Sequence, residues 1–346
     1  MEEHNLSRFS KSVRVAGALA ALATATAASA QPAADFNAGK PITLIVGAGE
    51  GAAYDLAARV IARRLRDHLP GAPAIVPRNM PGASQIRATE YAFNLAPRDG
   101  TALLIAQPSV VLNKVLNPAA RYEPREFTWI GRVQPTIGLG VVWRDSPARD
   151  FDDARRRDVV FGANSPTGPQ AMLPTALNGF AGAKFRVVTG YESEHRALLA
   201  MERGEIDGIG NVMSDSLLTP GGWITRGLAR PLYAAGLKRL PRLPDVPTVV
   251  ELANGEEGKA VMRLMVAISE LGLNLMAPPG VPPERVATLR RAFDAMMADA
   301  AFVEDIGKPG FGVDPMTGED LAAFVTANFS PSPDFAARFR AATLGP

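Results

Sequence analysis

A run of small residues at positions 47–55, Gly-Ala-Gly-Glu-Gly-Ala-Ala-Tyr-Asp, joins a predicted strand to a predicted helix. The first amides of a helix lack intrahelical acceptors and lie at the positive end of the helix dipole, so they attract anions. Small side chains let a ligand approach the backbone closely. We therefore predict an anion-binding loop whose amides donate hydrogen bonds to carboxylate oxygens. The predicted donors are Gly51, Ala52, Ala53 and Tyr54.

Two other interpretations of this loop stay open. Gly47, Gly49 and Ala52 formally match a dinucleotide-binding fingerprint, although no acidic residue closes the second predicted strand, where Pro77-Arg78-Asn79 stands. Alternatively, the glycines serve only a tight turn. Anion binding, a plain turn and dinucleotide binding therefore remain three separate hypotheses for one segment.

The loop also contains two carboxylates, which would repel an anion. We expect Asp55 to point away from the ligand and to act as a structural cap that holds N–H groups of the loop. Glu50 either faces solvent or favours a ligand that has a positive group as well.

A second loop at residues 164–170, Asn-Ser-Pro-Thr-Gly-Pro-Gln, follows another predicted strand and opens another predicted helix. Its hydroxyl and amide groups would add side-chain donors, and capping of the helix by Ser165 or Thr167 is the simpler, compatible interpretation. We expect the two loops to face one cleft. The predicted ligand-binding residues of the second loop are Asn164, Ser165, Thr167 and Gly168, and those predicted to shape the cleft are Gln107, Ser109, Tyr191 and Asn211.

Patterns for catalysis or metal binding are sparse. The chain contains no cysteine, which excludes disulfides, thiolate catalysis and cysteine-based metal sites. His195 stands near Glu192 and Glu194, but no cluster with metal-ligand spacing accompanies it. No Gly-x-Ser-x-Gly segment occurs, yet convergent triads have no fixed spacing, so a secreted α/β hydrolase with an unrecognised active site is the alternative function. We predict a binding protein with no catalytic residues, no cofactor and no metal.

Short apolar runs alternate with amphipathic helices in the first part of the chain. Strands are predicted at 42–46, 74–76 and 101–106, and helices at 54–69 and 85–95. Such alternation is typical of a parallel sheet with right-handed crossovers, in which ligands bind beyond the carboxyl ends of the strands. The loops that follow strands and open helices are therefore the expected binding positions.

A second α/β set begins at 136–143 and continues with predicted strands at 159–162, 184–190 and 206–210. A chain of 346 residues with 47% apolar content is long enough for two cores, so two lobes are expected. The predicted division gives residues 31–135 plus 241–346 to lobe 1 and residues 136–240 to lobe 2. The chain would cross between the lobes near 133–137 and 236–242, as paired hinge strands that permit closure.

The first thirty residues have the three parts of a secretory signal peptide, with Ala28-Ser29-Ala30 as the cleavage pattern. We predict cleavage after Ala30 and a periplasmic location. Removing this segment lowers the formal charge from +2 to +1, because three basic and two acidic side chains leave with it. A nearly neutral chain without a basic patch is not expected to bind nucleic acid.

Several segments from both predicted lobes occur in a distinctive order along the chain: Tyr54-Asp55-Leu56-Ala57-Ala58-Arg59, Asn79-Met80-Pro81-Gly82-Ala83, Phe127-Thr128-Trp129-Ile130-Gly131, Val188-Thr189-Gly190-Tyr191 and Leu243-Pro244-Asp245-Val246-Pro247. In this order the chain resembles the receptors of tripartite tricarboxylate transporters, the Bug or TctC-like extracytoplasmic solute-binding proteins. The resemblance spans nearly the whole chain after residue 30.

The resemblance implies an α/β protein with a type II periplasmic-binding-protein fold. Each of its two lobes would contain a mixed, mostly parallel sheet flanked by helices, and two crossing strands would form the hinge. It also implies a Venus-flytrap cleft that captures a small organic anion, a carboxylate, and delivers it to membrane permease subunits. We expect a monomer. Three segments depart from the family pattern: Glu50 to Ala53, the second-lobe loop with Pro166 and Pro169, and Glu192 to Glu194. The resulting acidic rim is expected to disfavour tricarboxylates.

Overall fold

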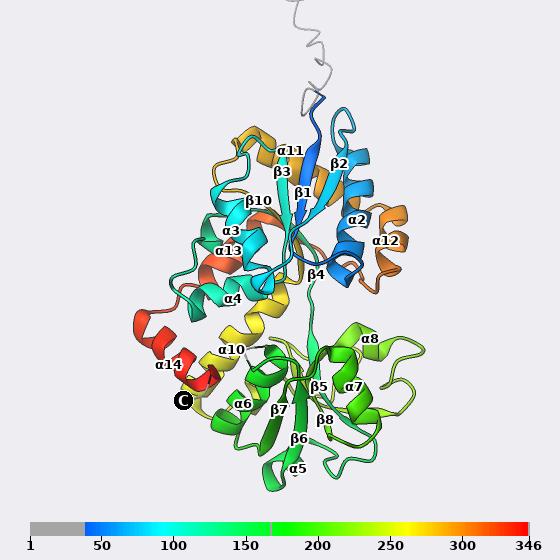
Figure 1. Ribbon diagram of the computed structural model, residues 1–346, viewed down its shortest axis with the longest axis vertical. Coiled ribbons are helices and arrows are strands. Elements are labelled where there is room, and N and C mark those ends of the chain that lie inside the picture. Colours follow the sequence, from blue (N-terminus) through cyan, green and yellow to red (C-terminus); the bar gives the residue numbers. More distant parts are fainter. Residues whose placement is uncertain (1–38, 167, 345–346) are drawn as a thin grey trace, which may run out of the picture.

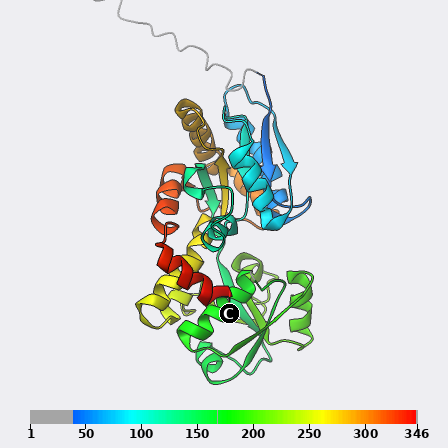
Figure 2. The same ribbon diagram turned by 60° about the vertical axis from the view of Figure 1, so that its left-hand side comes forward.

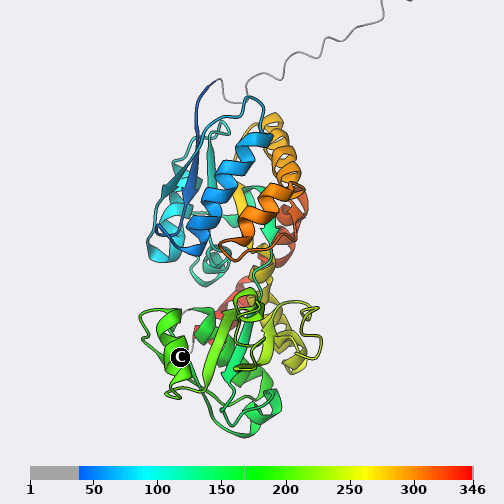
Figure 3. The ribbon, with the colours of Figure 1, turned by 90° about the vertical axis from the view of Figure 1, so that its right-hand side faces the viewer.

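The structure, a computed structural model, describes residues 39–166 and 168–344. Two α/β lobes are stacked along the long axis of the molecule (Figure 1) and are joined by a narrow waist (Figure 3). Each lobe is built on one sheet with helices packed against it. The predicted signal peptide with its cleavage point after Ala30, and the predicted ligand-binding residue Thr167, lie outside the described residues.

The sheet of the first lobe has six strands in the order β11-β4-β10-β3-β1-β2. β1 is parallel to β2 and β3, whereas β10 is antiparallel to β3 and β4, and β11 is antiparallel to β4. The sheet is therefore mixed, and only β10 and β11 run against the common direction. The strands are β1 (Ile42–Val46), β2 (Ile75–Asn79), β3 (Ala102–Ile105), β4 (Thr128–Gln134), β10 (Leu273–Ala277) and β11 (Met316–Thr317).

Helices cover both faces of this sheet, so every residue of its central strands β3 and β10 is buried, and all but Asn274 are apolar. α2 buries Ala57, Ile61 and Leu65, spaced by four residues, in the core on one face, together with α11 and α12. α3, α4 and α13 contribute to the core on the other face. The helices are α2 (Ala53–Leu65), α3 (Ile86–Asn94), α4 (Ser109–Leu116), α11 (Pro283–Met297), α12 (Ala300–Gly307) and α13 (Gly318–Asn328), with 3-10 turns η1 (Arg66–His68), η2 (Ala83–Gln85) and η3 (Pro124–Glu126).

The sheet of the second lobe has five strands in the order β7-β6-β8-β5-β9. β6 is parallel to β7 and β8, and β5 is antiparallel to β8 and β9, so only β5 runs against the common direction. The strands are β5 (Gly138–Trp143), β6 (Val159–Ala163), β7 (Phe185–Thr189), β8 (Gly208–Met213) and β9 (Ala229–Ala235). The helices are α5 (Phe151–Arg156), α6 (Pro169–Ala181), α7 (Glu194–Glu202), α8 (Ser214–Leu218) and α9 (Val249–Leu252).

The chain crosses between the lobes at two places. The first is the segment 135–137 between β4 and β5, where a crossing was predicted. The second is α10 (Gly255–Leu271), which contacts α6 and α9 of the second lobe and β4 and α13 of the first. The predicted crossing at 236–242 is wrong, because Leu240 and Leu243 pack against the core of the second lobe and keep this segment beside its sheet.

The C-terminal helix α14 (Pro333–Leu344) also contacts both lobes, through α6 and α4. Figure 2 shows it, in red, descending from the first lobe onto the second. We propose a division in which residues 236–254 belong to the second lobe and in which α10 and α14 bridge the two lobes.

Candidate ligand-binding cleft between the two lobes

A cleft of about 600 Å³ lies between the lobes. The first lobe contributes the start of α2, the turn before α3 and helix α4, and the second lobe contributes the loop before α6 and the end of β8. α10 adds a further wall. The predicted site residues that line this cleft are Tyr54, Gln107, Ser109, Asn164, Ser165, Gly168 and Asn211.

Four predicted residues within the described chain lie elsewhere. Gly51, Ala52 and Ala53 are exposed and are not among the residues that line the cleft. Tyr191 also lies off the cleft wall, where its ring is close to Gly162 and packs against the core of the second lobe. The structure therefore brings the helix-side end of the first loop to the cleft, but not its middle.

Asp55 is buried beneath the first loop and does not line the cleft. Its carboxylate accepts hydrogen bonds from Gly51 N at 2.8 Å, Asn79 Nδ2 at 2.8 Å and Arg59 Nε at 3.0 Å. Burial alone would raise the pKa of Asp55, but these hydrogen bonds outweigh burial and hold the pKa below its ordinary value. The negative charge is thus compensated inside the loop.

Tyr54 is the residue of the first loop that reaches the cleft. Its ring packs edge-on against Phe311, with 5.9 Å between the ring centroids. Burial raises the pKa of the Tyr54 hydroxyl above its ordinary range, opposed by a hydrogen bond with Thr136. The hydroxyl therefore stays protonated at neutral pH, and it links helix α2 to the segment that crosses between the lobes.

The turn before α3 contributes Ser84 to the cleft wall and helps to position Gln107. Ala83, Ser84 and Gln85 have φ values of 46°, 51° and 73°, a left-handed run that non-glycine residues adopt only at an energetic cost. The run turns Gln85 inward, where its Oε1 accepts a hydrogen bond from Gln107 N at 2.9 Å. Gly47 leaves room for this side chain, since a Cβ there would lie 2.6 Å from Gln85 Oε1. The loops after β1, β2 and β3 are thereby coupled.

The loop before α6 is held by a hydrogen-bond relay. Asn164 N donates to Gln170 Oε1 at 3.3 Å, and Gln170 Nε2 donates to the carboxylate of Glu194 at 2.8 Å. Burial raises the pKa of Glu194, and the hydrogen bond from Gln170 opposes that shift only partly. An acidic group therefore lies behind the loop rather than on the cleft wall.

Asn211 reaches the cleft from β8 because the neighbouring strand provides space for it. A Cβ on Gly138 of β5 would lie 1.8 Å from Asn211 Oδ1. The amide of Asn211 therefore occupies the volume that a side chain at position 138 would fill.

Many lining residues were not predicted, and most of these are apolar. Thr136 and Ser269 add hydroxyl groups near the crossings. Leu112 and Leu116 are spaced by four residues on α4, a pattern that places both on one face of the helix. The lining residues of α10 have no such signal for the cleft, because residues 241–346 are predicted to belong to lobe 1 alone. No lining residue in the described part of the chain is charged. The apolar lining residues are Ile86, Leu112, Leu116, Met172, Leu173, Met213, Met265, Val266 and Ile268, with Pro108, Pro169 and Ala235.

Other kinds of site were sought in residues 39–166 and 168–344. Within them, no group of three or more His, Cys, Asp or Glu side chains is arranged to hold a metal ion. Over the same residues, none of the helices is both long enough and apolar enough to cross a bilayer. His195 is exposed and does not line the cleft.

Two α/β lobes with mixed sheets and a cleft between them define a protein of the periplasmic solute-binding class. Residues 57–332 match the model of the TctC family, the tripartite tricarboxylate transporter family receptor, and the chain belongs to this family. It is 28% identical to protein BugT of Bordetella pertussis over 299 residues, covering 83% of this chain and 85% of BugT. It is also 28% identical to a UPF0065 protein of Cupriavidus necator, covering 90% of each chain.

Solved structures share the fold. A TctC solute-binding protein from Polaromonas is 19% identical, with a TM-score of 0.67 over 87% of this chain and 97% of that chain. The protein MatC from Rhodopseudomonas palustris, solved with bound malate, is 19% identical with a TM-score of 0.59 over 88% of this chain and 98% of MatC. The predicted family and the predicted type II periplasmic-binding-protein fold are thereby confirmed, and family membership implies a periplasmic location.

Proposed function

We propose that the protein is an exported receptor that binds a small carboxylate-bearing metabolite in the interlobe cleft and delivers it to a tripartite tricarboxylate-type permease. One observation carries this proposal: Tyr54 at the start of α2 and Ser165 and Gly168 before α6 line the same cleft from opposite lobes. The free amides of a helix start favour an anion, so a carboxylate held between the lobes would draw them together.

The alternative, a secreted hydrolase, finds less support in the cleft. A nucleophile in a hydrolase needs a general base within hydrogen-bond reach. Ser84, Ser109 and Ser165 line the cleft, but His195 does not, and no lining residue of the described chain is a histidine, lysine, aspartate or glutamate. The amide and hydroxyl groups that line the cleft can hydrogen-bond to a ligand, and none of them is basic enough to take a nucleophile's proton.

Binding can be tested with the chain that begins at Gln31. We expect one carboxylate from a panel of mono-, di- and tricarboxylates and amino acids to bind at a ratio of one to one in calorimetry, with no consumption of the ligand by NMR. Ligand at a hundredfold excess over Kd should stabilise the fold by about 2.7 kcal/mol. Failure of every panel member to bind, or turnover of an ester that is lost in His195→Ala, would contradict the receptor function.

Export is a separate part of the proposal. The predicted cleavage after Ala30 means that the protein recovered from the periplasm of an expressing bacterium should begin at Gln31. N-terminal sequencing checks this directly, and an intact N-terminus in the cytoplasmic fraction would contradict it.

A further inference from the structure

A second pocket, of about 400 Å³, lies between helix α4, the turn η3 and the junction of α13 with α14. It shares no lining residue with the interlobe cleft, and its volume is in the range of small-molecule sites. Its charged lining residues are Lys114, Glu123, Arg125 and Arg340. Three cations against one carboxylate leave this lining with a formal charge of +2.

Two of these cations are held by neutral groups. Lys114 Nζ donates to the backbone oxygens of Pro118 at 3.0 Å and Ala120 at 2.8 Å, and Arg340 Nη1 donates to Val115 O at 3.2 Å. Within the described chain, the hydrogen-bond partners of both side chains are therefore carbonyl oxygens, which orient a cation without neutralising it.

The carboxylate of the pocket is already paired. Arg125 Nε donates to Glu123 Oε1 at 2.8 Å, and Arg125 Nη1 donates to Ser330 Oγ, between α13 and α14, at 3.2 Å. Burial raises the pKa of Glu123, but hydrogen bonds from Arg125 and the charges of Arg125 and Lys114 outweigh burial and hold the pKa below its ordinary value. The charge of Lys114 therefore acts inside this pocket, and the excess remains positive.

The three cations come from three separate segments. Lys114 belongs to α4, Arg125 to η3 and Arg340 to α14, and the hydrogen bond from Arg340 joins α14 to α4. Like charges repel more strongly as they approach. An anion bound to all three cations would remove this repulsion and hold α14 against the first lobe.

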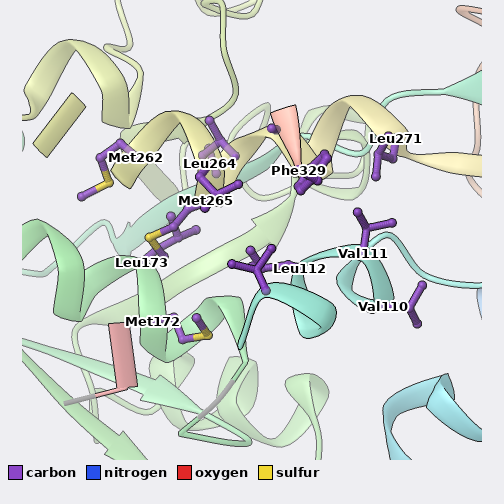
Figure 4. Close-up of a cluster of buried hydrophobic side chains, with 14 of the residues drawn as sticks. Val110, Val111, Leu112, Met172, Leu173, Met262, Leu264, Met265, Leu271 and Phe329 are labelled. Carbon is purple, nitrogen blue, oxygen red and sulfur yellow. The ribbon is translucent and has the colours of Figure 1, made fainter. Parts of the chain in front are cut away.

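Helix α4 separates the pocket from the cleft. Lys114 is two residues from both Leu112 and Leu116, which line the cleft, and so lies about 160° around the helix from each. The two sites share one hydrophobic cluster, part of which Figure 4 shows: Leu112 and Leu173 line the cleft, and Phe329 lines the second pocket. The pocket is therefore a separate site behind one wall of the cleft.

We propose that this pocket binds a compact dianion, of the size of sulfate or hydrogen phosphate, through Lys114, Arg125 and Arg340, and that the bound anion holds α14 against the first lobe. Two negative charges match the excess of +2. The guanidinium groups offer paired N–H donors to such an ion. The site goes beyond the receptor function and does not depend on it, because none of its residues lines the cleft.

Sulfate is the probe, titrated by calorimetry into the chain that begins at Gln31, with chloride at equal ionic strength as the reference. We expect sulfate to bind at least tenfold more tightly than chloride and to slow the hydrogen exchange of backbone amides in α14. Chloride that binds as tightly as sulfate, or exchange in α14 that sulfate leaves unchanged, would overturn the proposal.

Two double variants locate the site. Lys114→Met with Arg340→Met should weaken sulfate binding at least tenfold. Lys259→Met with Arg291→Met removes the same charges from outside both sites and is the matched control, which should keep the affinity. Full affinity in the first pair would place sulfate elsewhere, and equal losses in the two pairs would show attraction to net charge alone; either result overturns the site.

A third variant cannot give its result through misfolding. Glu123→Gln removes the negative charge of the pocket and keeps an oxygen that accepts from Arg125. We expect it to strengthen sulfate binding about threefold, because one repulsive charge is lost. Unchanged or weaker binding would contradict an anion beside Glu123.

Two acidic side chains of a partner protein would present the same charges to the pocket. The acetylated and amidated dipeptide Glu-Glu is the probe for that source. We expect it to bind more weakly than sulfate, because its side chains lose conformational freedom on binding. Tighter binding of the dipeptide would overturn the assignment of a compact dianion.

Discussion

Asn211 and Gly138 show how a residue that lines the cleft can depend on a neighbour that does not line it. The amide of Asn211 enters the cleft through the space above Gly138, where a Cβ would lie 1.8 Å from Asn211 Oδ1. The atom in conflict belongs to a flexible side chain, so the fold can accommodate an alanine at position 138 by moving Asn211 away. The substitution would therefore alter the site more than the fold.

We expect Gly138→Ala to weaken carboxylate binding about tenfold, the loss of roughly one hydrogen bond to an ionised ligand, with a melting temperature within about 3 °C of the unaltered protein. Gly179→Ala, in α6 with no atom near its Cβ position, is the control; it should keep the affinity and gain slightly in stability. Calorimetry and thermal unfolding check both, and unchanged affinity in Gly138→Ala would remove Asn211 from the site.

The buried carboxylate of Asp55 stabilises the first loop by accepting a hydrogen bond from its backbone. Because its buried carboxylate accepts hydrogen bonds from Gly51, Asn79 and Arg59, an alanine removes three charge-assisted hydrogen bonds at once. We expect Asp55→Ala to cost about 2–4 kcal/mol in the free energy of unfolding, measured with urea. Asp67→Ala, at an exposed carboxylate, should cost less than about 0.5 kcal/mol, and equal losses in the two variants would contradict the structural role of Asp55.

Most of the lining residues that the sequence predicts lie next to helix starts, and Asn211, in strand β8, is an exception. Tyr54, Ser165 and Gly168 follow from the strand-loop-helix pattern, because that pattern fixes where free amides occur. Gly51, Ala52 and Ala53 are expected at the cleft but lie outside its lining, and Tyr54 is the residue of this loop that lines it. Thr136, Ser269 and the apolar wall depend on how the lobes are placed, which local periodicity does not encode.

At the scale of elements, the conformation of the loop before α6 is held by a hydrogen bond to α7, the helix that follows β7. Gln170 joins the backbone of Asn164 to Glu194 at the start of α7, so the position of one helix sets the loop of another. Burial raises the pKa of Glu194 above its ordinary value of 4.5. A carboxyl with a raised pKa in the folded state favours folding while protonated, and this contribution is lost as the pH rises through the folded pKa.

We therefore expect Glu194→Gln, which keeps an acceptor for Gln170, to be more stable than the unaltered protein at pH 7 by a few degrees. The difference should shrink as the pH falls toward 4.5, where the native carboxyl takes up its proton. Thermal unfolding between pH 4 and pH 8 measures this. Glu192→Gln, at an exposed neighbouring position, should follow the unaltered protein, and parallel curves for Glu194→Gln would contradict the effect of burial.

The sequence pattern predicts most helices and strands. It predicts less well which segments connect the two lobes. The strand at 42–46 matches β1 at both ends because Pro41 and Gly47 bound a buried apolar run. The predicted helix 54–69 ends as α2 at Leu65 and continues as the 3-10 turn η1. α10 lies in the segment predicted to belong to lobe 1, yet it contacts both lobes, because an amphipathic pattern shows that a helix packs and not which of two lobes it packs against.

At the scale of the whole molecule, the two crossings meet at Gly272, where α10 joins β10. Gly272 has a φ of +45°, and a Cβ there would lie 1.8 Å from Gln134 O and 2.7 Å from the Cα of Pro135. Gln134 ends β4 and Pro135 opens the other crossing, so Gly272 lets the two connections approach. Closure of the lobes around a ligand would have to bend both connections at this point.

We expect Gly272→Ala to destabilise the protein by about 3 kcal/mol or more, because the clash is with backbone atoms that cannot turn aside. Gly255→Ala, at the other end of α10, separates the two causes: its φ is also positive, at +66°, but no atom lies near its Cβ position. It should lose only about 1 kcal/mol, from backbone strain alone. Urea unfolding compares the variants. Equal losses would show that strain, and not the approach of the two crossings, makes glycine necessary at position 272.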